Sequence, residues 1–134
     1  MLAIGLQESR FMFRYQKLVG KPYQKGPARG FWQFERGGGV IGVMSHEATK
    51  AHAERICGLR NVPFDSVLVH ARLETDDVLA AGFARLLLLT DPRALPDVTN
   101  SVGAWDCYIR NWRPGKPHIE TWAKFHQQAR EAVL

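Results

Sequence analysis

Residues 77–89 are the most apolar continuous segment of the chain, and they constrain its fold more than any other feature. Leu79 and Phe83 recur at helical spacing in a run composed almost entirely of aliphatic residues. Thr75, Asp76 and Asp77 mark the start of this run, and the segment Asp91-Pro92 stops it. A helix this apolar cannot lie on a surface, so we predict that it is the central core helix.

Helical signals recur along the rest of the chain, whereas strand signals are almost absent. Residues 40–44 are the only plausible strand, and they fit a helix as well. Residues 20–30 are rich in Gly, Pro and Lys and predict a loop. Because 134 residues suffice for one hydrophobic core, we predict a single, mainly α domain over residues 1–134 with little or no β-structure. The remaining helices are expected at residues 1–15, 45–60, from 65, from 97, and 119–133.

The first of these helices is apolar on nearly all sides, which predicts burial rather than an amphipathic surface position. Leu2, Ile4 and Leu6 precede a polar break at residues 7–10, and the apolar pattern resumes at Phe11. A helix that begins at residue 1 is short on its N-terminal side. We interpret it either as part of an element that is longer in relatives or as a trimmed product.

The net charge of +5 favours an anionic partner, such as nucleic acid, a membrane surface or a bacterial wall polymer. The basic residues are scattered without a long run of like charge, so charge alone selects none of these. Neither a signal peptide nor an apolar run of membrane-spanning length is present. Cys57 and Cys107 match no redox spacing, and we expect both to be reduced and packed, with one disulfide as the alternative in an oxidising compartment.

Two motif-like strings do not indicate a cofactor or metal. Residues 37–42 match a dinucleotide fingerprint as a string, but that motif requires a parallel sheet that the chain does not predict. These glycines more naturally form a turn beside a cleft. His46 and His52 are six residues apart, which places them on different faces of a helix, whereas the zinc signature requires a spacing of four. We therefore predict neither a metal nor a cofactor.

Glu8 is the first candidate for chemistry. It lies with Ser9 at the end of the buried apolar helix. Apolar surroundings raise the pKa of a carboxyl, because burial disfavours its charged form, and a general acid needs such a raised pKa. The alternative is a surface glutamate paired with Arg10 or Arg14.

Two aromatic motifs follow. Residues 30–35 read Gly-Phe-Trp-Gln-Phe-Glu, in which Trp32 and Gln33 suit a sugar ring and its polar groups, or else begin a buried aromatic helix. Farther along, Trp105, Tyr108 and Trp112 share one helix face. Trp105 fits the core, whereas Tyr108 and its neighbour Asn111 have polar ends that need a partner or a substrate if buried.

In this order the three motifs resemble the lysozyme-like superfamily, in particular soluble lytic transglycosylases, goose-type lysozymes and small phage-encoded muramidases. Glu8-Ser9 is similar to the Glu-Ser pair that ends the catalytic helix of that family. Residues 30–33 are similar to its Gly-Leu-Met-Gln cleft segment, with Trp32 in the place of Met. Tyr108 and Asn111 are the nearest match to its Ala-Tyr-Asn segment, although they are three positions apart.

The resemblance covers residues 4–115 and implies a helical lysozyme-like fold with a catalytic cleft. It implies a peptidoglycan muramidase that cleaves the β-1,4 bond between N-acetylmuramic acid and N-acetylglucosamine, with Glu8 as the acid. The residues that it implies for binding the glycan are Ser9, Trp32, Gln33, Tyr108, Asn111 and Trp112.

Glu35 is the candidate for a second catalytic carboxylate, because it follows Gln33 closely. In inverting hydrolysis the two carboxyl groups stand about 6.5–9.5 Å apart and the second activates water. Lytic transglycosylases need no second carboxylate, because the sugar's own hydroxyl closes a 1,6-anhydro ring. Both outcomes stay open, and Glu35 has an alternative role in a helix end or an ion pair with Arg29 or Arg36.

Phage-encoded members imply a protein that is made in a host cytoplasm, as an endolysin or a virion-associated enzyme, and acts as a monomer on peptidoglycan strands of the cell wall. A wall-binding or phage structural module of the same fold without turnover is the alternative. A nucleic-acid-binding helical domain would account for the net charge, but the chain lacks a clustered basic helix, so we expect no nucleic-acid partner.

Overall fold

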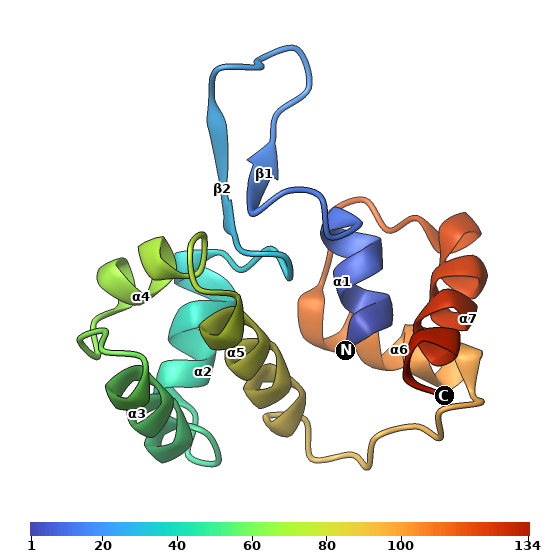
Figure 1. Ribbon diagram of the computed structural model, residues 1–134. Coiled ribbons are helices and arrows are strands. Elements are labelled where there is room, and N and C mark those ends of the chain that lie inside the picture. Colours follow the sequence, from blue (N-terminus) through green and yellow to red (C-terminus); the bar gives the residue numbers. More distant parts are fainter.

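Helix α5 (Asp77–Leu89) lies at the centre of the computed structural model, which describes residues 1–134 (Figure 1). Leu79, Phe83 and Ala84 of this helix are fully buried. Its N-cap is Asp76, whose side chain accepts a hydrogen bond from the Leu79 backbone N–H. The predicted core helix is thus confirmed, with the start that the sequence indicated.

The other helices form two groups around α5. On one side, α2 and α3 pack against α5, and on the other α1 and α6 pack with α7 (Figure 1). One continuous core joins the groups, since Ile4, Phe83 and Tyr108 belong to the same cluster of buried side chains. None of the helices combines the length and apolar character that crossing a bilayer requires. The helices around α5 are α1 (Leu2–Ser9), α2 (Ile41–Ser45), α3 (Lys50–Leu59), α4 (Ser66–Arg72), α6 (Ser101–Trp112), α7 (Trp122–Val133), and the short turns η1 (Arg36–Val40) and η2 (Ile119–Thr121).

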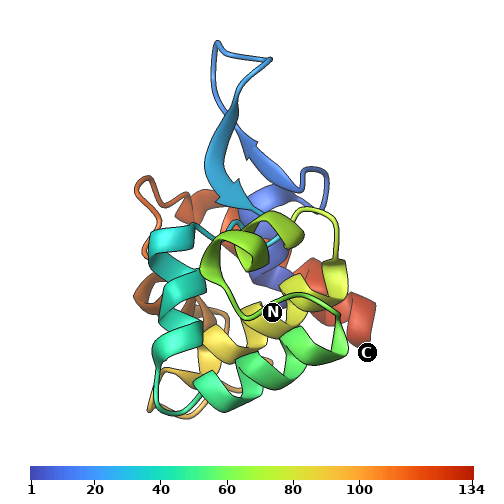
Figure 2. The same ribbon diagram turned by 90° about the vertical axis from the view of Figure 1, so that its left-hand side faces the viewer.

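The mainly α prediction is confirmed, but the loop expected at residues 20–30 contains a strand. Strands β1 (Tyr15–Lys17) and β2 (Lys25–Arg29) form an antiparallel hairpin that projects from the helical body in both views (Figures 1 and 2). Contacts distant in sequence support the hairpin at its base, where the His70 ring lies 2.8 Å from the Pro27 carbonyl oxygen. The composition of residues 20–30 does not reveal these distant contacts, and it therefore predicted a loop.

The helix predicted for residues 1–15 is wrong in its second half, because α1 ends at Ser9. Arg10 and Phe11 both adopt left-handed backbone conformations, with φ of 56° and 53°. The Ser9 hydroxyl donates to the Gly5 carbonyl and accepts from the Phe11 N–H, so it closes the helix end. The Phe11 ring then folds back against Trp32 at 5.5 Å between centroids. Aromatic packing therefore ends the helix one residue after Glu8.

The structure decides one open expectation for residues 40–60 and corrects another. Residues 40–44, which fitted a strand or a helix, are helical, since they fall in η1 and α2. The helix expected over residues 45–60 does not begin at Ser45, because the Ser45 hydroxyl donates back to the Ile41 carbonyl and Ser45 ends α2. The next helix begins at Lys50, after the buried Thr49.

Gly30 turns the chain from β2 toward the aromatic segment. Its φ of 77° is in the left-handed region that favours glycine, and its N–H donates to the Arg14 carbonyl. A Cβ at this position would lie 3.0 Å from the Leu73 carbonyl oxygen and 3.3 Å from the Cβ of Ala80. Close approach and backbone conformation both require glycine here.

We expect Gly30→Ala to lower the free energy of unfolding by more than the matched variant Gly20→Ala. Gly20 has a similar φ of 74° but no heavy atom within 4 Å of its ideal Cβ. Gly20→Ala should therefore lower the free energy of unfolding by only about 1–2 kcal/mol, which is the cost of placing a residue with a Cβ in a left-handed backbone conformation. Gly30→Ala should add an overpacking cost of about 1–3 kcal/mol. Urea unfolding measures both, and equal losses in the two variants would contradict the crowding argument.

Candidate active site

Glu8 lies in the last turn of α1 and is half-buried. Its Oε1 atom accepts a hydrogen bond of 2.9 Å from the Tyr108 hydroxyl of α6. It forms no ion pair: Arg14 binds Asp77 at 2.9 Å, and the Arg10 guanidinium lies over the Phe125 ring. The alternative of a surface glutamate paired with either arginine is therefore wrong.

The surroundings of Glu8 change its acidity. Burial raises the pKa of Glu8 from 4.5 to about 7, and the hydrogen bond from Tyr108 opposes this rise because it stabilises the carboxylate. The pKa of Tyr108 is raised well above its usual value, first by burial and then by the negative charge of Glu8. Near neutral pH the pair therefore holds a carboxyl that is partly protonated and a hydroxyl that keeps its proton.

A cavity of about 300 Å³ opens beside Glu8. Its volume is at the lower end of the range for small-molecule sites, about 300–1,000 Å³. Its walls come from helices α1, α5 and α6, strand β2, the Gly-rich turn η1 and the segment after α6. The cavity is lined by Glu8, Gln16, Ala28, Gln33, Phe34, Glu35, Gly38, Gly39, Leu87, Asn111, Trp112, Arg113, Pro114 and Gly115. Candidates from all three sequence motifs thus meet at one cavity.

Gln33 reaches this cavity from a strained turn. Its φ of 54° is left-handed, and its side-chain amide donates to the Gly30 carbonyl at 2.9 Å. Paired backbone hydrogen bonds between Arg29 and Phe34 close the turn around it. The fold therefore holds Gln33 in an unfavourable conformation at the cavity wall, which is common where a side chain is placed for function.

Asn111 reaches the cavity with its amide already oriented. Its Nδ2 donates to the Asp91 carboxylate at 3.0 Å and to the Cys107 carbonyl at 2.9 Å. The pKa of Asp91 is lowered to about 2, first by the hydrogen bond from the Arg93 backbone N–H, then by Asn111, and also by Arg110. Because both amide hydrogens have acceptors, the Asn111 carbonyl oxygen remains as the group available to a ligand.

Tyr108 and Trp112 follow the helix-face pattern that the sequence predicted. Trp105 and Trp112 both contact the Tyr108 ring, with centroids at 5.5 Å and 6.3 Å. Trp112 lines the cavity, and its indole N–H donates to the Trp32 carbonyl. Of the two tryptophans that the sequence predicted as binding residues, Trp112 is therefore the one at the cavity.

Three predicted binding residues do not line the cavity. Tyr108 is 3% exposed and reaches the site only through its hydrogen bond to Glu8. Trp32 is only 6% exposed, and its indole donates to the Met1 carbonyl, so it packs in the core and does not line the cavity. Ser9 is buried and is used to close α1. Both residues are supporting groups: Trp32 anchors α1 and α6, and Ser9 ends the helix that carries Glu8.

Glu35 is an exposed residue on the cavity wall, immediately before η1. It forms no ion pair with Arg36 or with Arg29, whose guanidinium binds backbone carbonyls instead. A carboxylate in this position is accessible to water and to a ligand in the cavity.

The sequence motifs missed several lining residues. Gln16 comes from the hairpin, and Arg113, Pro114 and Gly115 come from the turn after α6. Arg113 ends α6 in a left-handed conformation with φ of 49°. Gly38 and Gly39, expected as a turn beside a cleft, do lie at the cavity, within the helical turn η1.

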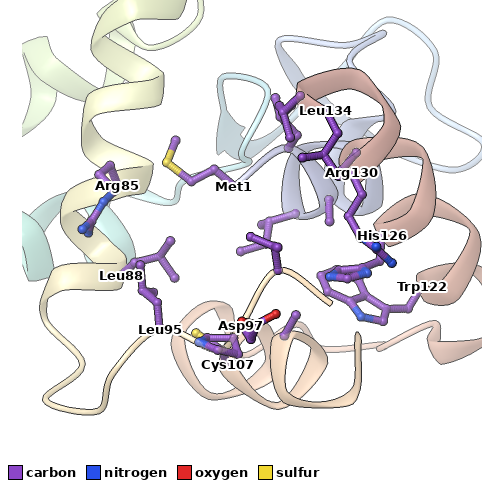
Figure 3. A pocket seen from close by; sticks show the side chains of 18 residues that line it. Met1, Arg85, Leu88, Leu95, Asp97, Cys107, Trp122, His126, Arg130 and Leu134 are labelled. Atoms are coloured by element: carbon purple, nitrogen blue, oxygen red, sulfur yellow. The ribbon is translucent and has the colours of Figure 1, made fainter. Parts of the chain in front are cut away.

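A second, larger cavity of about 410 Å³ lies between α1, α5, α6 and α7 (Figure 3). Its lining is mostly apolar and includes Leu88, Leu95 and Trp122. Arg130 and His126 also line it, but no carboxyl with a raised pKa does. We therefore take the Glu8 cavity as the candidate active site.

No group of three or more His, Cys, Asp or Glu side chains lies close enough together to hold a metal ion. Cys57 and Cys107 are free and buried, as predicted, and burial raises the pKa of both thiols.

Comparison with protein-family models found no match, and comparisons with curated proteins and with solved structures found none either. The case for a function therefore depends on the geometry around Glu8.

The pKa of Glu8 predicts how stability changes with pH. Below pH 4.5 the carboxyl is protonated in the folded and unfolded states, and between pH 4.5 and 7 only the unfolded state ionises. The wild type should therefore lose up to about 3 kcal/mol of unfolding free energy as the pH rises through this window. Glu8→Gln should lack this loss and exceed the wild type in stability above pH 7.

Urea unfolding of the wild type and Glu8→Gln at several pH values measures this difference. Glu54→Gln, at an exposed position on α3, is the matched control and should follow the wild type at every pH. A difference between Glu8→Gln and the wild type that does not change from pH 4 to pH 8 would contradict the raised pKa.

Proposed function

We propose that the chain is a glycosidase that cleaves the β-1,4 bond between N-acetylmuramic acid and N-acetylglucosamine in peptidoglycan, with Glu8 as the general acid. The observation that carries the proposal is a carboxyl with a pKa of about 7 beside a cavity that an indole, three amides and a second carboxyl also line. The resemblance of the three motifs to the lysozyme-like superfamily supplies the substrate class.

Glu8 suits the acid role for a chemical reason. Cleavage of a glycosidic bond requires a proton for the leaving oxygen, and an acid is most effective when its pKa is near the working pH. The Tyr108 hydroxyl occupies Oε1 of Glu8, so Oε2 is the oxygen left to carry the proton toward a ligand. After donating the proton, the carboxylate is stabilised by the same hydroxyl and can act as a base.

The remaining cavity groups suit an N-acetylated sugar. The Trp112 ring offers an apolar face for a pyranose, and the Asn111 carbonyl oxygen can accept from a hydroxyl or an acetamido N–H. Gln16 and Gln33 add two further amides, and the Arg113 guanidinium can donate to the lactyl amide carbonyl of muramic acid.

The two possible reactions differ in the role of Glu35. If Glu35 activates water on the opposite face of the sugar, the product has a reducing end. If the C6 hydroxyl of muramic acid attacks C1 instead, Glu8 accepts its proton and the product is a 1,6-anhydro sugar. A wall-binding module without turnover is the remaining alternative.

Digestion of purified peptidoglycan followed by mass spectrometry tests the proposal. The wild type should release muropeptides, and Glu8→Gln should lower the rate at least about 100-fold, because it keeps the shape of the side chain but removes the proton donor. The matched control Glu54→Gln should retain wild-type activity.

Fragments with reducing ends would indicate hydrolysis, and Glu35→Gln should then also be impaired; anhydro ends would indicate transglycosylation. Binding of peptidoglycan without released fragments would favour the binding module. Wild-type activity in a folded Glu8→Gln variant would exclude Glu8 as the acid.

The pH dependence of kcat/KM provides an independent prediction. Because the acid must be protonated, the rate should fall as the pH rises through about 7. Tyr108→Phe removes the hydrogen bond that lowers the pKa of Glu8, so this limb should move to higher pH. A purely structural role of Tyr108 would reduce the rate or stability without moving the limb.

A further inference from the structure

The net positive charge of the chain comes entirely from residues 9–34, which include the hairpin. Residues 9–34 contain six of its 18 Lys and Arg residues and none of its 13 Asp and Glu residues. The rest of the chain has twelve basic and thirteen acidic residues, so its net charge is −1 while the segment carries +6. The basic residues are scattered along the sequence, but the net charge is concentrated in one projecting element.

The tip of this hairpin exposes apolar side chains completely. Between β1 and β2, Val19 is 102% exposed and Tyr23 is 100% exposed. The hairpin projects away from the helices, so these side chains lie far from the core (Figures 1 and 2). Neither of them contributes to the stability of the fold, which suggests that they meet a partner.

The base of the hairpin is attached to the body, which leaves the cations at its tip free. Lys25 pairs with Glu74 at 2.7 Å, and Arg14 pairs with Asp77. Lys21, between the strands, and Lys17, which lies opposite Lys25 in the hairpin, form no ion pair. The Lys17 ammonium lies over the Phe13 ring, 4.7 Å from its centroid. The outer part of the hairpin therefore presents two ammonium groups without an acidic partner, beside an exposed aliphatic and an exposed aromatic side chain.

We propose that the hairpin tip is a docking site for an anionic phospholipid surface. Val19 and Tyr23 enter the interfacial layer, where an aliphatic side chain leaves water and a tyrosine keeps its hydroxyl among the headgroups. Lys17 and Lys21 bind the phosphates, with their aliphatic stems along the apolar layer. This inference is independent of the role proposed for Glu8.

A lipid surface accounts for the tip better than another polyanion does. Contact with a nucleic acid or an anionic wall polymer would use the lysines, and a base could stack on Tyr23. Neither of those partners would remove Val19 from water at the far end of a projecting hairpin, whereas a bilayer interface does. The remainder of the chain, with a net charge of −1, would then face away from the membrane without strong attraction or repulsion.

Co-sedimentation of the full chain with vesicles tests this proposal. Vesicles of phosphatidylcholine mixed with phosphatidylglycerol should bind the wild type at least about tenfold more tightly than phosphatidylcholine alone. Lys17→Gln with Lys21→Gln should lower the affinity for mixed vesicles about thirtyfold. Val19→Ser with Tyr23→Ser should lower it about tenfold.

The matched charge control is Arg55→Gln with Lys124→Gln, which removes two exposed cations from α3 and α7 and should change the affinity less than about threefold. Circular dichroism should show unchanged helix content in every variant, since all these positions are exposed. As a direct readout, brominated lipids should quench the tryptophan fluorescence of the Tyr23→Trp variant more than that of the wild type, which has only the four native tryptophans.

Four results would overturn the proposal. The first is equal binding to both vesicle types, and the second is an equal loss in the hairpin and control charge variants. The third is a Val19→Ser, Tyr23→Ser variant that keeps full affinity, because the tip would then be a general polyanion site. The fourth is an affinity for duplex DNA that equals the affinity for mixed vesicles and does not change in the Val19→Ser, Tyr23→Ser variant. The tip would then be a polyanion site.

Discussion

The stacking of Tyr108 on Trp122 holds together the part of the structure on which the candidate site depends. The two rings are nearly parallel, at 4°, with centroids 5.4 Å apart, and they join α6 to α7. Helix α7 in turn packs along α1. This arrangement brings the Tyr108 hydroxyl to the carboxyl of Glu8, although the two residues are 100 positions apart in sequence. The position of the only side-chain partner of Glu8 is therefore set by aromatic packing.

The same packing leaves Glu8 in a costly position. A buried carboxylate is normally paired with a cation or accepts several hydrogen bonds, and Glu8 has one neutral hydroxyl. Asp91 has the partners that Glu8 lacks, since Arg110, Asn111 and a backbone N–H all bind its carboxylate and lower its pKa to about 2. Two carboxyl groups that both bind side chains of α6 thus have widely separated pKa values because their surroundings differ. Such a separation is expected where one group acts as an acid and the other orients a ligand-binding amide.

Much of the fold was predictable, because strong local signals and the final structure agree. Helix α5 follows from its apolar run and from Asp76, and α4 begins after Asp65, whose carboxylate accepts from two backbone N–H groups. The hairpin and the early end of α1 were not predictable in this way. Both depend on contacts with residues far along the chain, and local composition carries no record of them. The segregation of charge was present in the sequence, but it becomes meaningful only when four of the six basic residues of this segment are seen on one projecting hairpin, residues 15–29.

For the candidate site, the sequence by itself determined which chemical groups were available: a glutamate in an apolar helix, an amide after a glycine, and a polar-tipped aromatic helix face. Helical spacing and burial of apolar residues are local properties, so these groups could be recognised one motif at a time. Only the tertiary structure decided that Trp112 rather than Trp32 lines the cavity, and that Ser9 ends a helix. Two neighbouring aromatic side chains have the same chemistry, and which of them is buried depends on the packing of the whole core.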